Sequence, residues 1–210
     1  MASALDLALL EPPLDRLPLL PTALRRRHVA LKTLDVTRTF PAPTFVKPGN
    51  DKSFPATVYA DAEALFRVTS DLSDAMPVLV SEPVIWESEY RVFAKDGEPT
   101  AISPYFRNGK LALDVGDGQW LAPPDELADA LTFATLVLRE AGHDLPAGVV
   151  LDVGIITGRG FAVVEANPAW ASGLYGCEPI DALDVIAASV YPTGEKGAGE
   201  SARAAITIEP

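Results

Sequence analysis

Two tight-turn signals, Asp96-Gly97 and Asn108-Gly109, constrain the fold of this chain more than any other feature. Such dipeptides favour two-residue turns between antiparallel strands, because both turn residues need positive φ angles. Residues 89–95 alternate between polar and apolar side chains before the first turn, and residues 100–106 and 110–114 read as the next strands. The middle of the chain is therefore predicted to form an antiparallel sheet of three consecutive strands.

Further strands and helices are predicted on both sides of this sheet. The additional strands are expected at residues 44–47, 56–59, 78–80, 149–156 and 161–167. The helices are expected at residues 22–34, 61–72, 124–140 and 181–190. These elements predict an α+β protein built on antiparallel sheets.

The chain is acidic, with 17 Lys and Arg against 29 Asp and Glu, which gives 17 − 29 = −12 over 210 residues. Nucleic acids and anionic membranes attract clustered Lys and Arg, so this charge argues against both as partners. The single cysteine, Cys177, excludes an intrachain disulfide, and no apolar run is long enough to span a membrane. We therefore expect a soluble, cytoplasmic enzyme or binding protein.

Residues 149–167 are predicted to form a hairpin with polar side chains on one face. If the turn within residues 157–160 has an even number of residues, Asp152 lies directly opposite Glu165, and Asn167 lies one diagonal step away on the same face. A three-residue loop would put the two acids on opposite faces. Converging oxygen ligands suit magnesium, and the alternative is an ordinary hairpin whose acids face water.

Several cationic side chains are candidates for binding an anionic ligand. Lys47 ends a predicted strand, and Lys52 and Ser53 follow in a polar loop that could cover a phosphate but has no Walker A sequence. Arg91 lies in an alternating strand and Arg107 lies beside a turn. Each of these residues has an ordinary alternative as a solvated surface side chain.

The candidate residues fall in segments whose order along the chain is informative. The segments are Phe45-Val-Lys47-Pro, Lys52-Ser-Phe, Val78-Leu-Val-Ser-Glu82-Pro-Val, Glu89-Tyr-Arg91, Leu151-Asp152-Val and Val164-Glu165-Ala-Asn167-Pro. Over about residues 44–190 this series resembles the ATP-grasp superfamily. It is most similar to the clade named for two arginines and a lysine, which is predicted to contain amide-bond-forming ligases. The ending Asn167-Pro-Ala-Trp170-Ala-Ser-Gly-Leu-Tyr175-Gly is similar to the ending of that clade.

The resemblance implies an ATP-grasp-like fold in which two α+β subdomains with antiparallel sheets hold ATP between them. The residues that it implies for ATP binding are Lys47, Lys52, Ser53, Glu82, Val84 and Glu89. The first three match the phosphate-binding lysine and the lid loop. The next two match the segment that meets the adenine edge, and the last matches an acid near the ribose or the second subdomain.

The resemblance also implies a magnesium site and a catalytic pair. Asp152, Glu165 and Asn167 match the magnesium ligands, and Glu165 is able to bridge two ions. Arg91 and Arg107 match the paired catalytic arginines of the clade. Such a pair suits the bidentate binding of an acyl phosphate or a substrate carboxylate.

The implied function is an ATP- and Mg²⁺-dependent carboxylate–amine ligase that forms an amide bond through an acylphosphate. Its substrates would be a small-molecule carboxylate and an amine, of amino-acid or peptide-like character. The alternatives are a non-catalytic ATP-binding module or subunit and an ATP-grasp phosphotransferase.

The expected organisation has four parts. Residues 1–43 would be an N-terminal extension with a short helix, residues 44–80 the first subdomain with the lid loop, residues 81–190 the second subdomain with the metal-binding hairpin, and residues 191–210 a loose tail. Superfamily ligases generally carry a pre-grasp domain, which we expect to be reduced or absent here. A homodimer or a partner subunit could then complete the substrate site.

Overall fold

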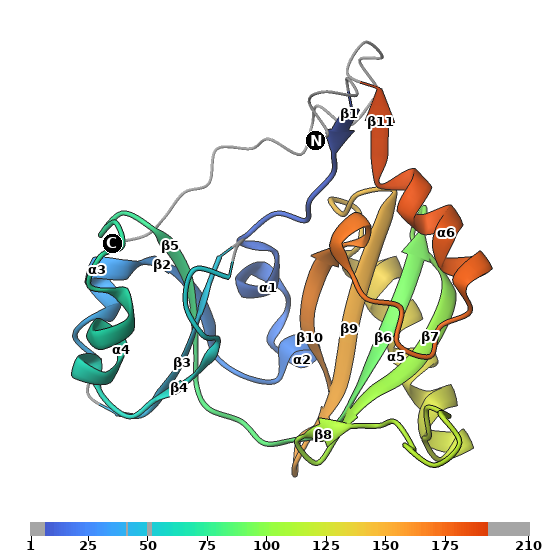
Figure 1. Ribbon diagram of the computed structural model, residues 1–210, viewed down its shortest axis with the longest axis horizontal. Coiled ribbons are helices and arrows are strands. Elements are labelled where there is room, and N and C mark those ends of the chain that lie inside the picture. The colour runs from blue at the N-terminus through green and yellow to red at the C-terminus, as the bar shows by residue number, and fades with distance from the viewer. Residues whose placement is uncertain (1–6, 41, 50–51, 193–210) are drawn as a thin grey trace. The chain divides into compact units, whose positions relative to one another are not determined.

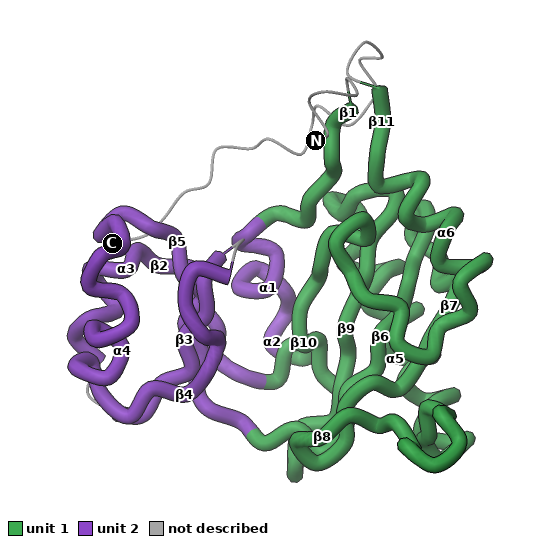
Figure 2. The backbone as a smooth tube through the Cα atoms, viewed as in Figure 1, with its two compact units in different colours: residues 1–13, 23–26, 85–204 green, residues 14–22, 27–84, 205–210 purple. Residues whose placement is uncertain are grey.

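The structure, a computed structural model, describes residues 7–40, 42–49 and 52–192 (Figure 1). The chain divides into two compact units (Figure 2): unit 1 comprises residues 1–13, 23–26 and 85–204, and unit 2 comprises residues 14–22, 27–84 and 205–210. Of the tail expected at residues 191–210, all but the first two residues lie outside the described part.

Unit 2 is built on a four-stranded antiparallel sheet with the order β2-β5-β3-β4. Its strands are β2 (Val29–Thr33), β3 (Thr44–Pro48), β4 (Thr57–Tyr59) and β5 (Pro77–Ser81). Its helices are α1 (Arg16–Leu19), α3 (Leu34–Thr37) and α4 (Ala62–Thr69). Helix α4 begins where the Asp61 carboxylate accepts a hydrogen bond from the backbone N–H of Ala64 at 2.8 Å. The buried core of this unit contains Leu34, Val46, Phe54, Tyr59, Leu65 and Val78.

The helix expected over residues 22–34 is wrong for most of its length. Helix α2 (Thr22–Arg25) ends after one turn, because Arg26 adopts a φ of 48°, which a right-handed helix does not accommodate. Val29 and Leu31 are buried in alternation in β2, which pairs with β5. Part of the expected N-terminal extension is thus a strand of the unit 2 sheet.

Unit 1 is built on a five-stranded antiparallel sheet with the order β10-β9-β6-β7-β8. The strands are β6 (Trp86–Lys95), β7 (Glu98–Arg107), β8 (Lys110–Leu111), β9 (Gly148–Ile156) and β10 (Gly160–Pro168). A separate two-stranded sheet joins β1 (Leu7–Leu9) to β11 (Val190–Pro192). The predicted turns have positive φ at both residues: 53° and 82° at Asp96-Gly97, and 50° and 76° at Asn108-Gly109. The α+β class with antiparallel sheets is confirmed.

Different helices cover the two faces of the unit 1 sheet (Figure 1). Helix α5 (Pro124–Ala141) lies on the face of Tyr90, whose hydroxyl donates to Glu126 of that helix. Helix α6 (Pro179–Ala188) lies on the other face, where its Ala182 and Val185 pack in a buried cluster with Phe93 of β6. Because side chains alternate along β6, Arg91 shares the face of Phe93.

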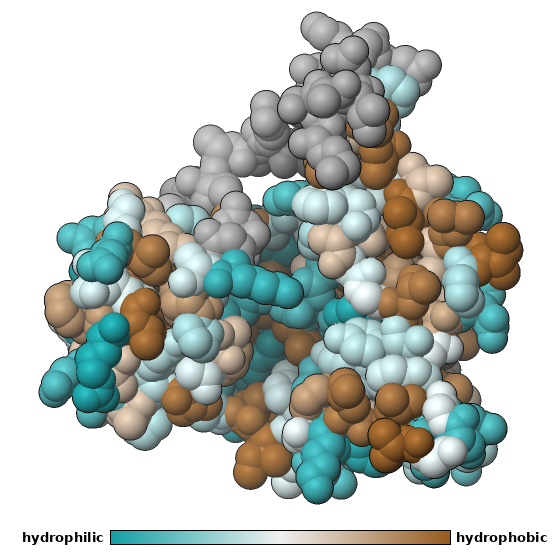
Figure 3. Space-filling model, in the orientation of Figure 1, coloured by the Kyte–Doolittle hydropathy of each residue, from teal (hydrophilic) through white to brown (hydrophobic). Residues whose placement is uncertain are grey.

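Large apolar side chains are exposed on the outer surface of α6. Ile180 is 71% exposed and Leu183 is 56% exposed. Figure 3 shows hydrophobic residues on this side of unit 1. Among the described helices, none has both the length and the apolar composition needed to cross a membrane.

Candidate functional site

The β9–β10 hairpin places Asp152 opposite Glu165, as predicted, but by a different route. Gly160 pairs with Ile156, so the turn contains three residues instead of an even number. The register then shifts by one residue at Val164, which is an extra residue in β10. This β-bulge offsets the odd-numbered loop and returns the two acids to one face.

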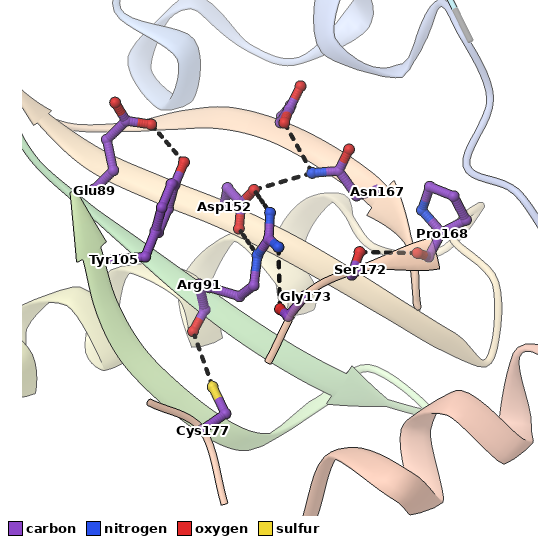
Figure 4. Close-up of polar contacts among 10 residues, drawn as sticks. Glu89, Arg91, Tyr105, Asp152, Asn167, Pro168, Ser172, Gly173 and Cys177 are labelled. Atoms are coloured by element: carbon purple, nitrogen blue, oxygen red, sulfur yellow. Dashed lines mark hydrogen bonds and ion pairs between the residues drawn. The ribbon is translucent and has the colours of Figure 1, made fainter. Parts of the chain in front are cut away.

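Asp152 lies at the centre of a buried polar cluster (Figure 4). Its side chain is 0% exposed, and its carboxylate oxygens accept hydrogen bonds from Nε and Nη2 of Arg91 at 2.9 and 2.7 Å. The two residues face each other because β6 pairs with β9 at this position. The Nδ2 atom of Asn167 donates to Asp152 at 3.0 Å and to Glu165 at 2.9 Å. The structure therefore brings together four of the predicted site residues.

The charge of Arg91 is fixed by this pairing. Burial by itself would lower the pKa of Arg91, but the hydrogen bonds and negative charge of Asp152 outweigh burial and raise it. The guanidinium is therefore permanently charged. Two further carboxylates, Glu89 and Glu165, lie in the same polar network. Three carboxylates around one guanidinium give this face an excess of negative charge, which suits a cation.

Two tyrosine rings contact Arg91. The ring centroids of Tyr105 and Tyr175 lie 5.3 and 4.8 Å from its guanidinium carbon, and the two rings stack with their centroids 5.0 Å apart. The hydroxyl of Tyr105 donates to Glu89 at 2.5 Å. Burial, followed by the negative charges of Asp152 and Glu89, raises the pKa of Tyr105, so its hydroxyl remains a donor.

Arg107 lies apart from this cluster, on the α5 side of the sheet. Its Nη2 atom donates to Glu126 at 2.5 Å and to the hydroxyl of Tyr90 at 3.3 Å. Burial raises the pKa of Tyr90, and the acceptor role of Glu126 raises it further. For Glu126, burial alone would raise the pKa, but the hydrogen bonds from Tyr90 and Arg107 outweigh burial and lower it. The structure does not bring the two predicted catalytic arginines together.

The other predicted ATP-binding residues belong to unit 2. Lys47 is half-buried near the end of β3, whereas Lys52 and Ser53 are exposed, with the Ser53 hydroxyl 3.7 Å from the sulfur of Met76. The backbone N–H of Glu82 donates to a carbonyl in the same unit, and the Glu82 carbonyl accepts from the Ser81 hydroxyl at 3.0 Å. Val84 is the last residue of unit 2 before the chain enters unit 1.

The oxygen-bearing side chains of the hairpin fit a hard divalent cation. Asp152 and Glu165 supply carboxylates, and Asn167 supplies an amide, all of which are ligand types that Mg²⁺ accepts. The amide nitrogen of Asn167 faces both acids, and a half-turn of the amide group would direct its oxygen to the same point. The described residues contain no group of three His, Cys, Asp or Glu side chains suited to a metal.

Three contributors to the site were not identified from the sequence as partners of Arg91. These are the ring of Tyr105, the ring of Tyr175 and the carbonyl of Gly173, which accepts from Arg91 Nη1 at 3.1 Å. The nearby Trp170 does not take part in these contacts, and its Nε1 atom donates to the carbonyl of Leu10 at 3.0 Å. The glycines on either side of Leu174-Tyr175 are a signal for close backbone approach that could have identified this segment.

Several solved structures are similar to this chain. A RimK domain ATP-grasp protein from Sphaerobacter thermophilus DSM 20745 is 18% identical, with 78% of this chain and 61% of that chain covered and a TM-score of 0.50. D-alanine–D-alanine ligase from Bacillus anthracis, complexed with ATP, is 18% identical, with coverage of 79% and 59% and a TM-score of 0.47. The ATP-grasp ligase PsnB, complexed with a minimal precursor, is 14% identical, with coverage of 79% and 56% and a TM-score of 0.43.

The chain spans about three fifths of the length of these structures. At 18% identity, the likeness to the RimK domain protein concerns the fold alone. No curated protein matches the chain. The chain matches a family model of the ATP-grasp domain, that of family 2 of the clade named for two arginines and a lysine. It covers residues 24–185, which is more than half of the 210 residues. The chain therefore belongs to the ATP-grasp domain family, in family 2 of that clade.

Proposed function

We propose that this protein is an ATP- and Mg²⁺-dependent ligase that joins a carboxylate to an amine, with an amino-acid or peptide-like substrate. Membership of the ATP-grasp family supports the ATP dependence. The observation that carries the proposal is the cluster of Arg91, Asp152, Glu165 and Asn167 in unit 1. It combines a fixed guanidinium, which binds anions, with oxygen ligands for a divalent cation.

The proposal assigns ATP-binding roles to residues of each unit. Lys47, Lys52 and Ser53 would bind the phosphates, Glu82 and Val84 would bind the adenine edge through their backbone atoms, and Glu89 would approach the ribose. Asp152, Glu165 and Asn167 would hold Mg²⁺, which supplies neutralisation of the phosphate charge when bound. The negative charge of the three carboxylates on this face supports a cationic occupant.

Arg91 would bind the reacting anion. Three of its five N–H groups donate within the described residues, two to Asp152 and one to Gly173, which leaves two for a substrate carboxylate or an acyl phosphate. Arg107 is the second proposed catalytic arginine. To reach the same anion it would have to leave both Glu126 and the α5 side of the sheet.

The chemistry balances without a protein nucleophile. A carboxylate oxygen attacks the γ-phosphorus of ATP and ADP leaves, which gives an acylphosphate. The amine nitrogen then attacks the acyl carbon, phosphate leaves, the amide bond forms and the amine loses one proton. Burial raises the pKa of Cys177 to about 12, so this thiol is protonated near neutral pH and does not compete as a nucleophile.

The test is release of ADP and phosphate from ATP and Mg²⁺ in the presence of panels of amino acids and short peptides. We expect release that requires both a carboxylate and an amine, with formation of an amide product. The control is Arg139→Gln, on the exposed side of α5, which should leave the activity unchanged. Release that needs no amine would instead identify a phosphotransferase.

A non-catalytic ATP-binding module is the second candidate, and it is favoured by the engagement of both Asp152 carboxylate oxygens with Arg91, which competes with a metal ion for them. Binding of ATP without turnover across the whole panel would select it. Such a module would need no specific carboxylate, so its ATP affinity should be unaffected by added amino acids. A ligase would instead show mutual enhancement between ATP and its acid substrate.

A further inference from the structure

A short segment, residues 173–177, wraps around Arg91, and we call it the Arg91 strap. Its first residue, Gly173, accepts a hydrogen bond from Nη1 of Arg91 at 3.1 Å. Its third residue, Tyr175, places its ring centroid 4.8 Å from the guanidinium carbon. Its last residue, Cys177, directs its sulfur at the backbone carbonyl of Arg91 at 3.8 Å (Figure 4). Three of five strap residues thus contact one arginine.

The backbone of Tyr175 is strained. Its φ of 50° lies in the left-handed region, which is unfavourable for a bulky side chain and easy for glycine. The ring nevertheless occupies a defined position, stacked on Tyr105 and at an edge-to-face angle of 75° to Trp120, with centroids 5.3 Å apart. Strain of this kind persists where the surroundings over-determine a conformation, and it clusters at functional sites.

The strap is also held by a close backbone approach at Gly176. Its N–H donates to the Ser103 hydroxyl at 3.0 Å. A Cβ atom at this position would lie 2.6 Å from that hydroxyl and 2.6 Å from the ring of Trp120, so only glycine fits. The backbone directly after Tyr175 is therefore packed closely against Ser103 and Trp120.

These contacts define the orientation of the guanidinium. Asp152 holds the edge formed by Nε and Nη2, and Gly173 holds one N–H of Nη1. The rings of Tyr105 and Tyr175 restrict rotation of the guanidinium plane. The direction of the two remaining N–H groups is consequently determined by the strap as well as by the carboxylate.

We infer that Tyr175 is a positioning residue: its ring orients Arg91 so that the remaining N–H groups of Arg91 bind the carboxylate or acyl phosphate of the substrate. This inference rests on the ligase function proposed above. Tyr175 is 39% exposed, so its outer edge can also contact the substrate next to that anion. Replacing Tyr175 should accordingly change kcat/KM for the acid substrate. The affinity for ATP should not depend on this residue.

The first test is independent of ligase activity and measures exchange of the Arg91 Nε–H by nuclear magnetic resonance. In the wild type and in Tyr175→Phe, which keeps the ring, we expect a protected Nε–H. In Tyr175→Gly, which suits the left-handed backbone and removes the ring, and in Tyr175→Leu, we expect exchange to be at least tenfold faster. Tyr191→Leu in β11 is the matched control and should leave exchange unchanged. Unchanged protection in both ring-deleted variants would overturn the inference.

The second test compares steady-state kinetics with ATP affinity from calorimetry. We expect Tyr175→Gly to lower kcat/KM for the acid substrate at least tenfold, with an ATP Kd within twofold of wild type, and Tyr175→Phe to restore the wild-type values. An equal loss of ATP affinity would show a general structural role and refute positioning. If the wild type itself ligates nothing, the proposed function fails, and the exchange experiment still decides whether Tyr175 orders Arg91.

Discussion

Replacing Asp152 by Asn exchanges one carboxylate oxygen for an NH₂ group within a buried ion pair of unit 1. The carboxylate is 0% exposed and accepts both Nε and Nη2 of Arg91, at 2.9 and 2.7 Å. An Asn amide offers one oxygen and one NH₂ group, so its NH₂ group would face an N–H donor of Arg91. The buried guanidinium would also lose its counter-charge. Breaking a buried pair in this way costs about 3–5 kcal/mol of unfolding free energy.

The same reasoning predicts that removing both partners restores most of the stability. The single variants Arg91→Met and Asp152→Leu should each lose about 3–5 kcal/mol of unfolding free energy, whereas the double variant that combines them should lie within about 2 kcal/mol of the wild type. Denaturant unfolding followed by tryptophan fluorescence is the suitable assay, because all three tryptophans lie in unit 1.

The control is the exposed pair of Glu63 and Arg67 on α4, with an N···O distance of 3.9 Å. Its double-mutant cycle should give a coupling energy below about 1 kcal/mol. The argument from buried charge would be refuted by a coupling energy between Arg91 and Asp152 no larger than this. It would also be refuted if Asp152→Asn lowered the free energy of unfolding by less than about 1 kcal/mol.

Three further predictions concern the site. Glu165→Gln should weaken Mg²⁺-dependent ATP binding in calorimetry, and an unchanged affinity would remove Glu165 from the metal site. Arg91→Lys keeps the charge but cannot bridge Asp152 in bidentate fashion, so turnover should fall while the ATP Kd stays the same, and equal loss of both would assign Arg91 a structural role. Burial raises the pKa of Cys177 from 9.0 to about 12, so unfolding releases a proton above pH 9 and stability should fall between pH 9 and 12. Cys177→Ala should make the loss of stability over that range less steep, and identical pH curves would contradict a buried neutral thiol.

Local sequence signals predicted most of the secondary structure. The two Asx-Gly turns and the alternating segments around them were sufficient for the meander, because a two-residue turn determines which strands are neighbours. The failure at residues 22–34 has a tertiary origin. An isolated helix of that length is marginal, whereas residues 29–33 pair with β5 along their whole length.

The site could be predicted only in part, because its central contact depends on strand order. Asp152 and Glu165 belong to one hairpin, but their pairing results from a three-residue turn combined with the bulge at Val164, and the sequence pattern indicated neither. Contact between Arg91 and Asp152 requires β6 to lie beside β9, and the intervening segment of the chain gives no local signal for that neighbour.

Arg107 shows how a small irregularity changes the face of a side chain. The β6–β7 register shifts where Tyr105 is an extra residue between the partners Pro104 and Phe106. Arg107 therefore lies on the α5 side, next to Glu126, and not on the side of Arg91. Such a bulge moves every later residue of a strand to the opposite face, and a sequence pattern alone does not reveal it.

The close approach at Gly176 limits how this part of the molecule can diverge among relatives. A methyl group there would collide with both the Ser103 hydroxyl and the indole of Trp120, so neither neighbour can relieve the collision alone. Replacement of the glycine thus requires smaller residues at positions 103 and 120 as well. We expect these three positions to covary in an alignment, with any non-glycine residue at 176 accompanied by the loss of the tryptophan.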